Sequence, residues 1–195
     1  MLKIGVTGGI GSGKSLVCDI ISKMGYPVYN ADSEARNLTN THPIIVSEIK
    51  KLFGDRIYLK GNLNRKVLAK KVFSNARLLE KLNAIVHPVV AEHFSQWVLD
   101  NSKSKLVFKE AAILFESGAF KQVDLVVAVW APVDIRIDRV CKRDGITKVD
   151  VLQRMYNQIN EDELLGRADY VIKNDEKALL VPQINSLIEQ LLLKL

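Results

Sequence analysis

The chain begins with the motif that most restricts the folds open to it. Residues 2–17, LKIGVTGGIGSGKSLV, read as an apolar strand, a glycine-rich turn and the start of a helix, in that order. Within this stretch four residues match the pattern G-x-x-x-x-G-K-[ST]: Gly8, Gly13, Lys14 and Ser15. The pattern predicts a loop that binds the phosphates of a nucleoside triphosphate.

The chemistry of the motif explains this prediction. Glycines allow successive backbone N–H groups to point at one phosphate, because no Cβ stands in the way. The following helix adds the positive end of its dipole, the Lys14 amine can reach the β- and γ-phosphate oxygens, and the Ser15 hydroxyl suits a Mg2+ ion. The alternative is a glycine-rich turn that matches by accident, and the fixed Gly-Lys-Ser between a strand and a helix argues against it. The motif leaves the acceptor open, since kinases, ATPases and GTPases share it.

The composition of the chain restricts its fold and function less strongly than this motif does. The chain has 195 residues, a hydrophobic content of 48% and a formal net charge of +6, which fit one globular domain with a modest attraction for anions. Its two cysteines, Cys18 and Cys141, lie far apart and form no C-x-x-C pair, so we expect neither a disulfide framework nor a zinc site. No apolar run approaches the ~18 residues of a membrane span, and the N-terminus enters directly into the first strand. We therefore expect a cytoplasmic protein without a membrane segment.

A candidate catalytic carboxylate follows the second expected strand. Residues 27–29 are expected to form this strand, which ends in Asn30-Ala31-Asp32. Open α/β sheets bind their ligands at the C-terminal edge of the strands, so Asp32 is placed to act on a substrate. It can equally be the N-cap of a helix over residues 33–38.

A helical block separates the second strand from the third. Residues 40–101 contain no convincing strand. Apolar spacing predicts helices over residues 42–53, 64–73 and 76–100. Pro88 is expected to kink or divide the last of them. The block is too long for a simple crossover, and we interpret it as a region that binds the acceptor, although its basic residues and His87 can also be ordinary residues of helix faces and helix ends.

Two later strands carry further candidates. Residues 105–108 and the nearly unbroken apolar run 123–131 are expected to be strands, the second of them central and buried on both faces. Glu110 follows the first of these, in the position of a Walker B acid that would hold the Mg2+ also bound by Ser15. Glu116 is the weaker candidate and can be a surface residue.

Arginines are concentrated in residues 134–167. Arg136, Arg139 and Arg143 lie at i, i+3 and i+7 on one helix face, where they repel each other unless an anion is present. A break at residues 144–147 divides the segment into a helix–turn–helix. We interpret it as a lid that brings guanidinium groups to the transferring phosphoryl group. The alternative is a helical hairpin whose arginines pair with acidic residues of the same segment: Asp134, Asp138 and Asp150.

The end of the chain completes an α/β domain. Residues 169–172 are expected to be a strand and residues 179–195 an amphipathic helix. Asn174, between them, can contact an adenine edge or serve as a turn residue. Together the elements predict a three-layer α/β/α fold with a five-stranded parallel sheet. In this single domain the core would comprise residues 1–32, 104–133 and 168–195, the acceptor-binding region residues 33–103 and the lid residues 134–167.

Along almost its whole length the sequence resembles the dephospho-CoA kinase family. The resemblance rests on motifs in a fixed order: TGGIGSGKS, NAD at 30–32, Arg65, LNAIVHP at 82–88, ILFESG at 113–118, RVCKRDG at 139–145, RMYNQ at 154–158 and ADYVIKN at 168–174. It implies a P-loop kinase core with a helical acceptor region and a lid. It also implies an enzyme that uses ATP and Mg2+ to phosphorylate the ribose 3′-hydroxyl of dephospho-coenzyme A, the last step of coenzyme A synthesis.

The resemblance assigns roles to individual residues as well. The ATP phosphates would be held by residues of the loop, namely Gly8, Gly9, Gly11, Ser12, Gly13, Lys14, Ser15 and Leu16. Asp32 would accept the proton of the acceptor hydroxyl or orient that group. Arg139 and Arg143 would belong to the lid over ATP and, with the loop lysine, stabilise the transferring phosphoryl group. Arg65 and His87 would lie on the acceptor side.

The chain departs from the family pattern in two places. The family usually has Asp-Ala-Asp where this chain has Asn30-Ala31-Asp32, so only the second acid is retained and the assignment of Asp32 is strengthened. The family also commonly has Pro-Leu where this chain has Ala112-Ile113.

Other functions fit less well. A regulatory GTPase would carry an N-K-x-D motif, which is absent from the sequence. A P-loop kinase for another small nucleoside or nucleotide stays open on the motifs alone. A nucleic-acid-binding ATPase would use the basic helices at residues 64–77 along a phosphate backbone. We expect dephospho-CoA as the small-molecule substrate, no nucleic-acid partner, and a monomer or weak homo-oligomer.

Overall fold

The computed structural model describes residues 1–73 and 75–195. It divides into two compact units, one formed by residues 1–30 and 98–195 and the other by residues 31–97.

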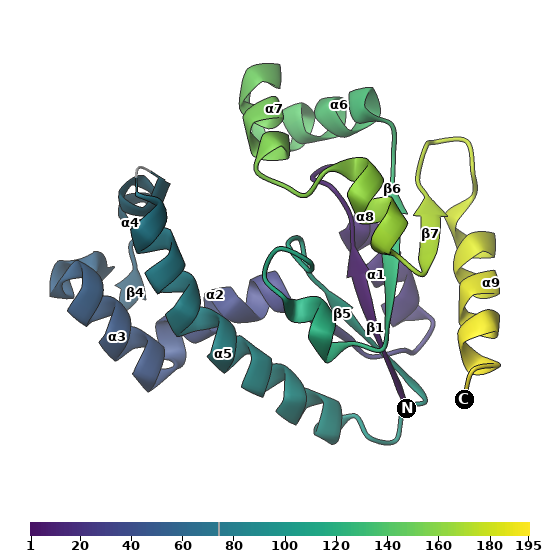
Figure 1. Ribbon diagram of the computed structural model, residues 1–195, viewed down its shortest axis with the longest axis horizontal. Coiled ribbons are helices and arrows are strands. Elements are labelled where there is room, and N and C mark those ends of the chain that lie inside the picture. The colour runs from purple at the N-terminus through teal and green to yellow at the C-terminus, as the bar shows by residue number, and fades with distance from the viewer. Residues whose placement is uncertain (74) are drawn as a thin grey trace. The chain divides into compact units, whose positions relative to one another are not determined.

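The first unit is built on a five-stranded parallel sheet, as the sequence predicts (Figure 1). Its strands are β1 (Leu2–Thr7), β2 (Val28–Asn30), β5 (Leu106–Glu110), β6 (Leu125–Trp130) and β7 (Tyr170–Lys173). Their order in the sheet is β2-β5-β1-β6-β7, with every neighbouring pair parallel. The loop after β1 therefore emerges at the C-terminal edge of the sheet, between the ends of β5 and β6.

Apolar side chains explain why these segments pack together. The central strands β1, β5 and β6 are almost entirely buried, as expected for parallel strands covered on both faces. One face of the sheet packs against α1 (Lys14–Lys23) and α9 (Leu180–Leu192), whose buried residues share one core with the strands. A short 3-10 helix, η2 (Ala119–Gln122), connects β5 to β6.

The arginine-rich segment forms three helices. They are α6 (Val133–Asp144), α7 (Lys148–Tyr156) and α8 (Glu161–Arg167), and α6 and α7 lie side by side beyond the end of β6 (Figure 1). Gly145, in the left-handed region at φ 65°, ends α6, and a reciprocal capping box between Thr147 and Asp150 begins α7. The expected break at residues 144–147 is confirmed. The expected helix–turn–helix is incomplete, because Asn160 caps a third helix.

The second unit is mainly helical. Its helices are α2 (Ala31–Thr41), α3 (Pro43–Phe53), η1 (Asp55–Ile57), α4 (Arg65–Phe73) and α5 (Ala76–Asp100), the last of which continues past the unit's final residue. The expectation of no strand was wrong, because β3 (Tyr58–Leu59) and β4 (Asn62–Leu63) form a small antiparallel hairpin. Lys60 and Gly61 connect them with positive φ angles of 49° and 81°, the conformation that a two-residue hairpin requires. Pro88 lies inside α5 and does not divide it.

No helix within residues 1–73 and 75–195 is both long enough and apolar enough to cross a membrane.

Candidate active site

The glycine-rich loop after β1 is shaped by close contacts that only glycine permits. A Cβ on Gly9 would overlap with the guanidinium of Arg136, and a Cβ on Gly13 would overlap with the side-chain amide of Asn174. Gly13 also has a φ of 92°, which side chains rarely adopt. The loop is therefore pressed against neighbouring side chains that hold its backbone.

Five consecutive carbonyl oxygens of the loop, those of residues 8–12, accept hydrogen bonds from side chains. Lys14 Nζ donates to Gly8 O at 2.7 Å and to Gly9 O at 3.2 Å. The next three carbonyls accept from groups outside the loop: Ile10 O from Arg136 Nε at 3.0 Å, Gly11 O from Arg139 Nη1 at 3.5 Å and Ser12 O from Asn174 Nδ2 at 2.8 Å.

This arrangement fixes the direction of the loop amides. In a trans peptide the C=O and the N–H point in opposite directions, and the described residues contain no cis peptide. Because the carbonyls of Ile10 and Ser12 are held on the outer side, the N–H groups of Gly11 and Gly13 point the other way. Within the described chain these two N–H groups donate to no protein atom. They form, with the N-terminus of α1, a site suited to an anion.

The oxygens that could hold a divalent metal lie beside the loop. Ser15 Oγ donates to Glu110 Oε1 at 2.6 Å, and Asn30 Nδ2 donates to Glu110 Oε2 at 2.6 Å. Glu110 is nearly buried at the end of β5, where the sequence placed a Walker B acid. A hydroxyl and a carboxylate are hard oxygen ligands of the kind that Mg2+ prefers. In the described ranges no group of three or more His, Cys, Asp or Glu side chains could hold a metal ion.

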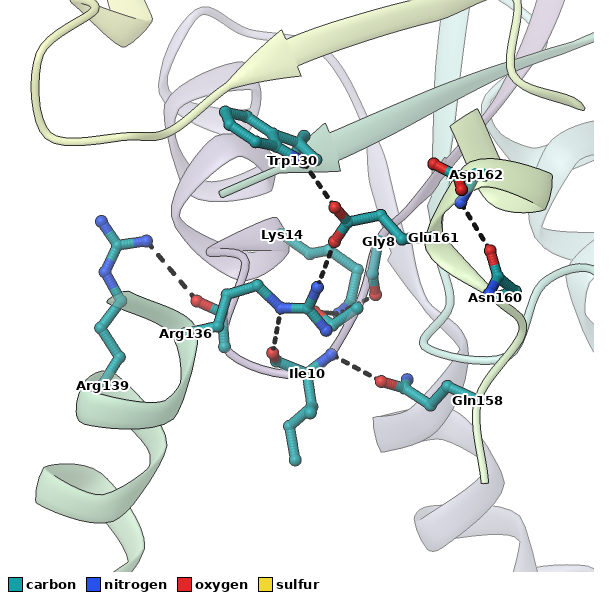
Figure 2. A network of polar contacts seen from close by, with 12 residues as sticks. Gly8, Ile10, Lys14, Trp130, Arg136, Arg139, Gln158, Asn160, Glu161 and Asp162 are labelled. Carbon is teal, nitrogen blue, oxygen red and sulfur yellow. Dashed lines mark hydrogen bonds and ion pairs between the residues drawn. The ribbon is translucent and has the colours of Figure 1, made fainter. Parts of the chain in front are cut away.

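Arg136 has a different partner from the one expected. Its side chain is buried and its Nη1 lies 2.6 Å from Glu161 Oε2, while the other oxygen of Glu161 accepts from Trp130 Nε1 at 2.9 Å (Figure 2). Burial lowers the pKa of Arg136, and the nearby Glu161 carboxylate opposes this shift. The expectation that the arginine face needs a bound anion is therefore wrong for Arg136. Its counter-ion is a protein carboxylate, and not one of the three acids expected.

The other two arginines of α6 are more exposed. Arg139 Nη2 lies 3.2 Å from Glu176 Oε1, and it also donates to the carbonyl of Asn174. Arg143 forms two hydrogen bonds with Asp144, which also pairs with Arg154 of α7. These arginines hold the pKa of Asp144 below its usual range.

Asn174 and Glu116 were candidates from the sequence but have other contacts than expected, and Gln158 was missed. The side-chain amide of Asn174, expected at an adenine edge or in a turn, donates to the loop backbone. Gln158 Oε1 accepts from Ile10 N at 2.7 Å (Figure 2). Glu116, considered a weak metal candidate, instead accepts from Ile159 N at 3.0 Å. Gln158 lies within the RMYNQ motif, which was the one signal that could have singled it out.

A cavity of about 260 Å³ adjoins the loop. It is lined by Gly9 of the loop and by residues after β5, at the end of β6 and between α7 and α8, among them Ala112, Trp130, Gln158 and Glu161. The cavity therefore opens beside the glycine-rich loop at Gly9.

Three of the expected site residues lie in the second unit. Asp32 is in the first turn of α2 and not before the helix, which removes the N-cap alternative. Arg65 Nη2 donates to Arg36 O at 2.8 Å, and burial and the nearby Arg36 charge lower the pKa of Arg65. His87 lies on α5, where burial lowers its pKa.

Comparison with known proteins identifies the family of this chain. The family model for dephospho-CoA kinase (CoaE) matches residues 2–179. A dephospho-CoA kinase of Bacteroides fragilis is 40% identical over 187 residues, which are 96% of this chain and 91% of that protein. The crystal structure of TT1252 from Thermus thermophilus has a TM-score of 0.84 and 34% identity, covering 100% of this chain and 97% of its own. The dephospho-CoA kinase of Campylobacter jejuni has a TM-score of 0.71 and 25% identity, with 96% of both chains covered.

Proposed function

The chain belongs to the dephospho-CoA kinase family, and we propose that it transfers the γ-phosphoryl group of ATP to the ribose 3′-hydroxyl of dephospho-CoA. It is a kinase of coenzyme A synthesis with a P-loop core. The observation that carries the assignment of its donor site is the loop over residues 8–12, whose carbonyls all accept side-chain hydrogen bonds.

The donor site would bind ATP through this loop. The N–H groups of Gly11 and Gly13 and the N-terminus of α1 would contact the phosphates, with Ser12, Ser15 and Leu16 in the same turn. The Lys14 amine would move from the loop carbonyls toward the β- and γ-phosphate oxygens. Arg139 and Arg143 would leave their carboxylate partners for the transferring group, since a phosphoryl group carries more negative charge than one carboxylate.

The transfer breaks one bond and forms another. The acceptor oxygen attacks the γ-phosphorus, the bond from that phosphorus to the β,γ-bridging oxygen breaks, and ADP takes the electron pair. The hydroxyl proton passes to the carboxylate of Asp32, which also aims the oxygen in line with the bond that breaks. Asn174 would act on the nucleotide through the loop that its amide holds.

Mg2+ would be held by the Ser15 hydroxyl and the Glu110 carboxylate together with phosphate oxygens of the nucleotide. When bound, this ion neutralises the charge that develops on the phosphates. Asn30 would orient Glu110 through the hydrogen bond from its amide.

The acceptor would bind to the second unit. Arg65 and Arg36 place two guanidinium groups close together there, and such a pair suits the diphosphate of dephospho-CoA. His87, whose pKa is lowered by burial, would contact the acceptor as a neutral imidazole. We also expect a cytoplasmic monomer or weak homo-oligomer that binds no nucleic acid.

An assay of acceptor dependence tests this function. The protein is incubated with ATP and Mg2+, and dephospho-CoA, free nucleosides or DNA are supplied in turn while ADP is measured. We expect ADP formation that depends on dephospho-CoA and yields coenzyme A. ADP formation that depends on a nucleoside would instead indicate a kinase for another small nucleoside or nucleotide. ADP formation that depends on DNA would indicate a nucleic-acid-binding ATPase.

A further inference from the structure

The segment between α7 and α8, residues 157–160, is hydrogen-bonded to two loops of the first unit. Gln158 Oε1 accepts from Ile10 N of the phosphate loop at 2.7 Å. Ile159 N donates to Glu116 Oε1, in the loop after β5, at 3.0 Å. Immediately after the segment, Glu161 binds Arg136 of α6 and Trp130 at the end of β6.

Two of these bonds meet at one residue of the phosphate loop. The N–H of Ile10 is held by Gln158, and its C=O is held by Arg136, which Glu161 in turn holds (Figure 2). Both peptide planes that include Ile10 are thus fixed from outside the loop. The second of these planes contains the N–H of Gly11, which donates to no protein atom within the described chain.

The charges in this contact also favour a defined geometry. Arg136 is 6% exposed, so its guanidinium needs a carboxylate close by. Both oxygens of Glu161 are used, one by Arg136 and one by Trp130, which leaves this carboxylate one orientation. A shift of Glu161 would therefore move Arg136 and, through it, the carbonyl of Ile10.

From these contacts we infer that Gln158 and Glu161 are positioning residues for the nucleotide: they set the direction of the Gly11 N–H by holding both backbone groups of Ile10. Both residues would act on the nucleotide through the phosphate loop that they hold. The inference goes beyond the proposed function, because it concerns nucleotide binding and not the identity of the acceptor.

The test uses the full chain and measures ADP binding by titration calorimetry. Gln158→Met removes the acceptor of the Ile10 N–H at nearly constant size, and Glu161→Gln removes the charge that holds Arg136. Gln153→Met is the control for the first variant, because Gln153 is exposed on α7. Glu163→Gln is the control for the second, because Glu163 pairs with Arg167 on the outside of α8.

We expect the Kd for ADP to rise about 5-fold in Gln158→Met, the effect of one lost hydrogen bond, and further in Glu161→Gln. The binding stoichiometry should not change, the KM for ATP should rise in parallel, and the KM for dephospho-CoA should stay as in the parent. Both controls should behave as the parent does. Failure of the proposed function would appear separately, as a parent protein that binds ADP but does not phosphorylate dephospho-CoA.

Three results would overturn the inference. The first is a Kd for ADP that stays within 2-fold of the parent in both variants. The second is a reduced stoichiometry with an unchanged Kd, since that means only less folded protein. The third is failure of both variants to fold, which would make the contacts structural. If only Glu161→Gln fails to fold, the Kd for ADP of Gln158→Met decides whether the inference holds.

Discussion

The amine of Lys14 lies against the loop that it is proposed to serve. It donates to the carbonyls of Gly8 and Gly9, so its charge is held at the loop before a nucleotide binds. When a phosphate replaces these carbonyls as the partner of the Lys14 amine, the amine gains a charge-assisted hydrogen bond. The two carbonyls can then bind water. Lys14 is therefore expected to matter much more for transfer than for folding.

We predict that Lys14→Met lowers kcat/KM for ATP by about 10²-fold or more, the usual effect of removing one donor from a site that stabilises developing charge. The midpoint of thermal unfolding should change little. Steady-state kinetics and circular dichroism melting measure the two effects. Lys23→Met, at the exposed end of α1, is the control and should keep full activity. An active Lys14→Met enzyme would refute the role of this amine.

Asp32 is expected to act on the acceptor hydroxyl, and its charge can be removed without changing its size. Asp32→Asn keeps the size of the side chain but removes its ability to take a proton, so kcat should fall by about 10²- to 10⁴-fold. The KM for ATP should change much less, because Asp32 is assigned to the acceptor hydroxyl. Glu34→Gln makes the same change within the same helical turn and should leave kcat unaltered. Full turnover by Asp32→Asn with dephospho-CoA would show that another group acts as the base.

Residues near in sequence were easier to assign than residues brought together by folding. The loop, Ser15 and Glu110 were identified correctly as neighbours, because the ends of adjacent parallel strands meet at one edge of a sheet. Gln158 and Ile10 are 148 residues apart, and no local pattern indicates that they meet. The pairing of Arg136 with Glu161 was missed for a related reason, since their contact depends on where α8 begins.

Helix α7 depends on its N-terminal cap. Thr147 Oγ1 accepts from Asp150 N at 3.3 Å, and Asp150 Oδ2 accepts from Thr147 N at 3.0 Å. The helix has only nine residues, too few to be stable by propensity alone. Its cap should therefore contribute to the stability of the whole arginine-rich segment.

Thr147→Ala is predicted to lower the free energy of unfolding by about 1 kcal/mol, the usual cost of a lost N-cap. Thr147→Ser should restore most of this loss, because serine caps as well as threonine does. Urea denaturation of the three proteins gives the comparison. Equal stability of the alanine variant and the parent would mean that the capping box does not hold α7.

The long, regular elements could be predicted and the short ones could not. The five strands and the helices α3, α4, α5 and α9 were placed within a few residues, because their apolar periodicity extends over whole turns or strands. The hairpin of β3 and β4 was missed because each strand has two residues, too few for an alternation pattern. Helix α8 was missed because its seven residues contain little apolar periodicity.

The central sheet also buries a charged side chain that the proposed mechanism does not use. Lys109, on β5 next to Glu110, is 2% exposed and donates from its amine to Gln122 Oε1. Burial lowers its pKa to about 8. Since an unfolded lysine has a pKa of about 10.4, Lys109 makes the stability of the molecule depend on pH.

The sign of this dependence follows from the two pKa values. Below about pH 8 the amine is protonated in both states, and the folded protein bears the full cost of the buried charge. Between about pH 8 and about 10.4 the unfolded chain binds more protons than the folded one, so this residue makes the free energy of unfolding rise with pH, by at most about 1.4 kcal/mol per pH unit. Lys109→Met removes the titrating group, and other groups cancel in the difference between the two proteins. Urea unfolding at pH 7, 8, 9 and 10 should show the parent gaining stability relative to Lys109→Met only above about pH 8. A constant difference across this range would mean that Lys109 stays charged in the folded protein, with a partner strong enough to offset its burial.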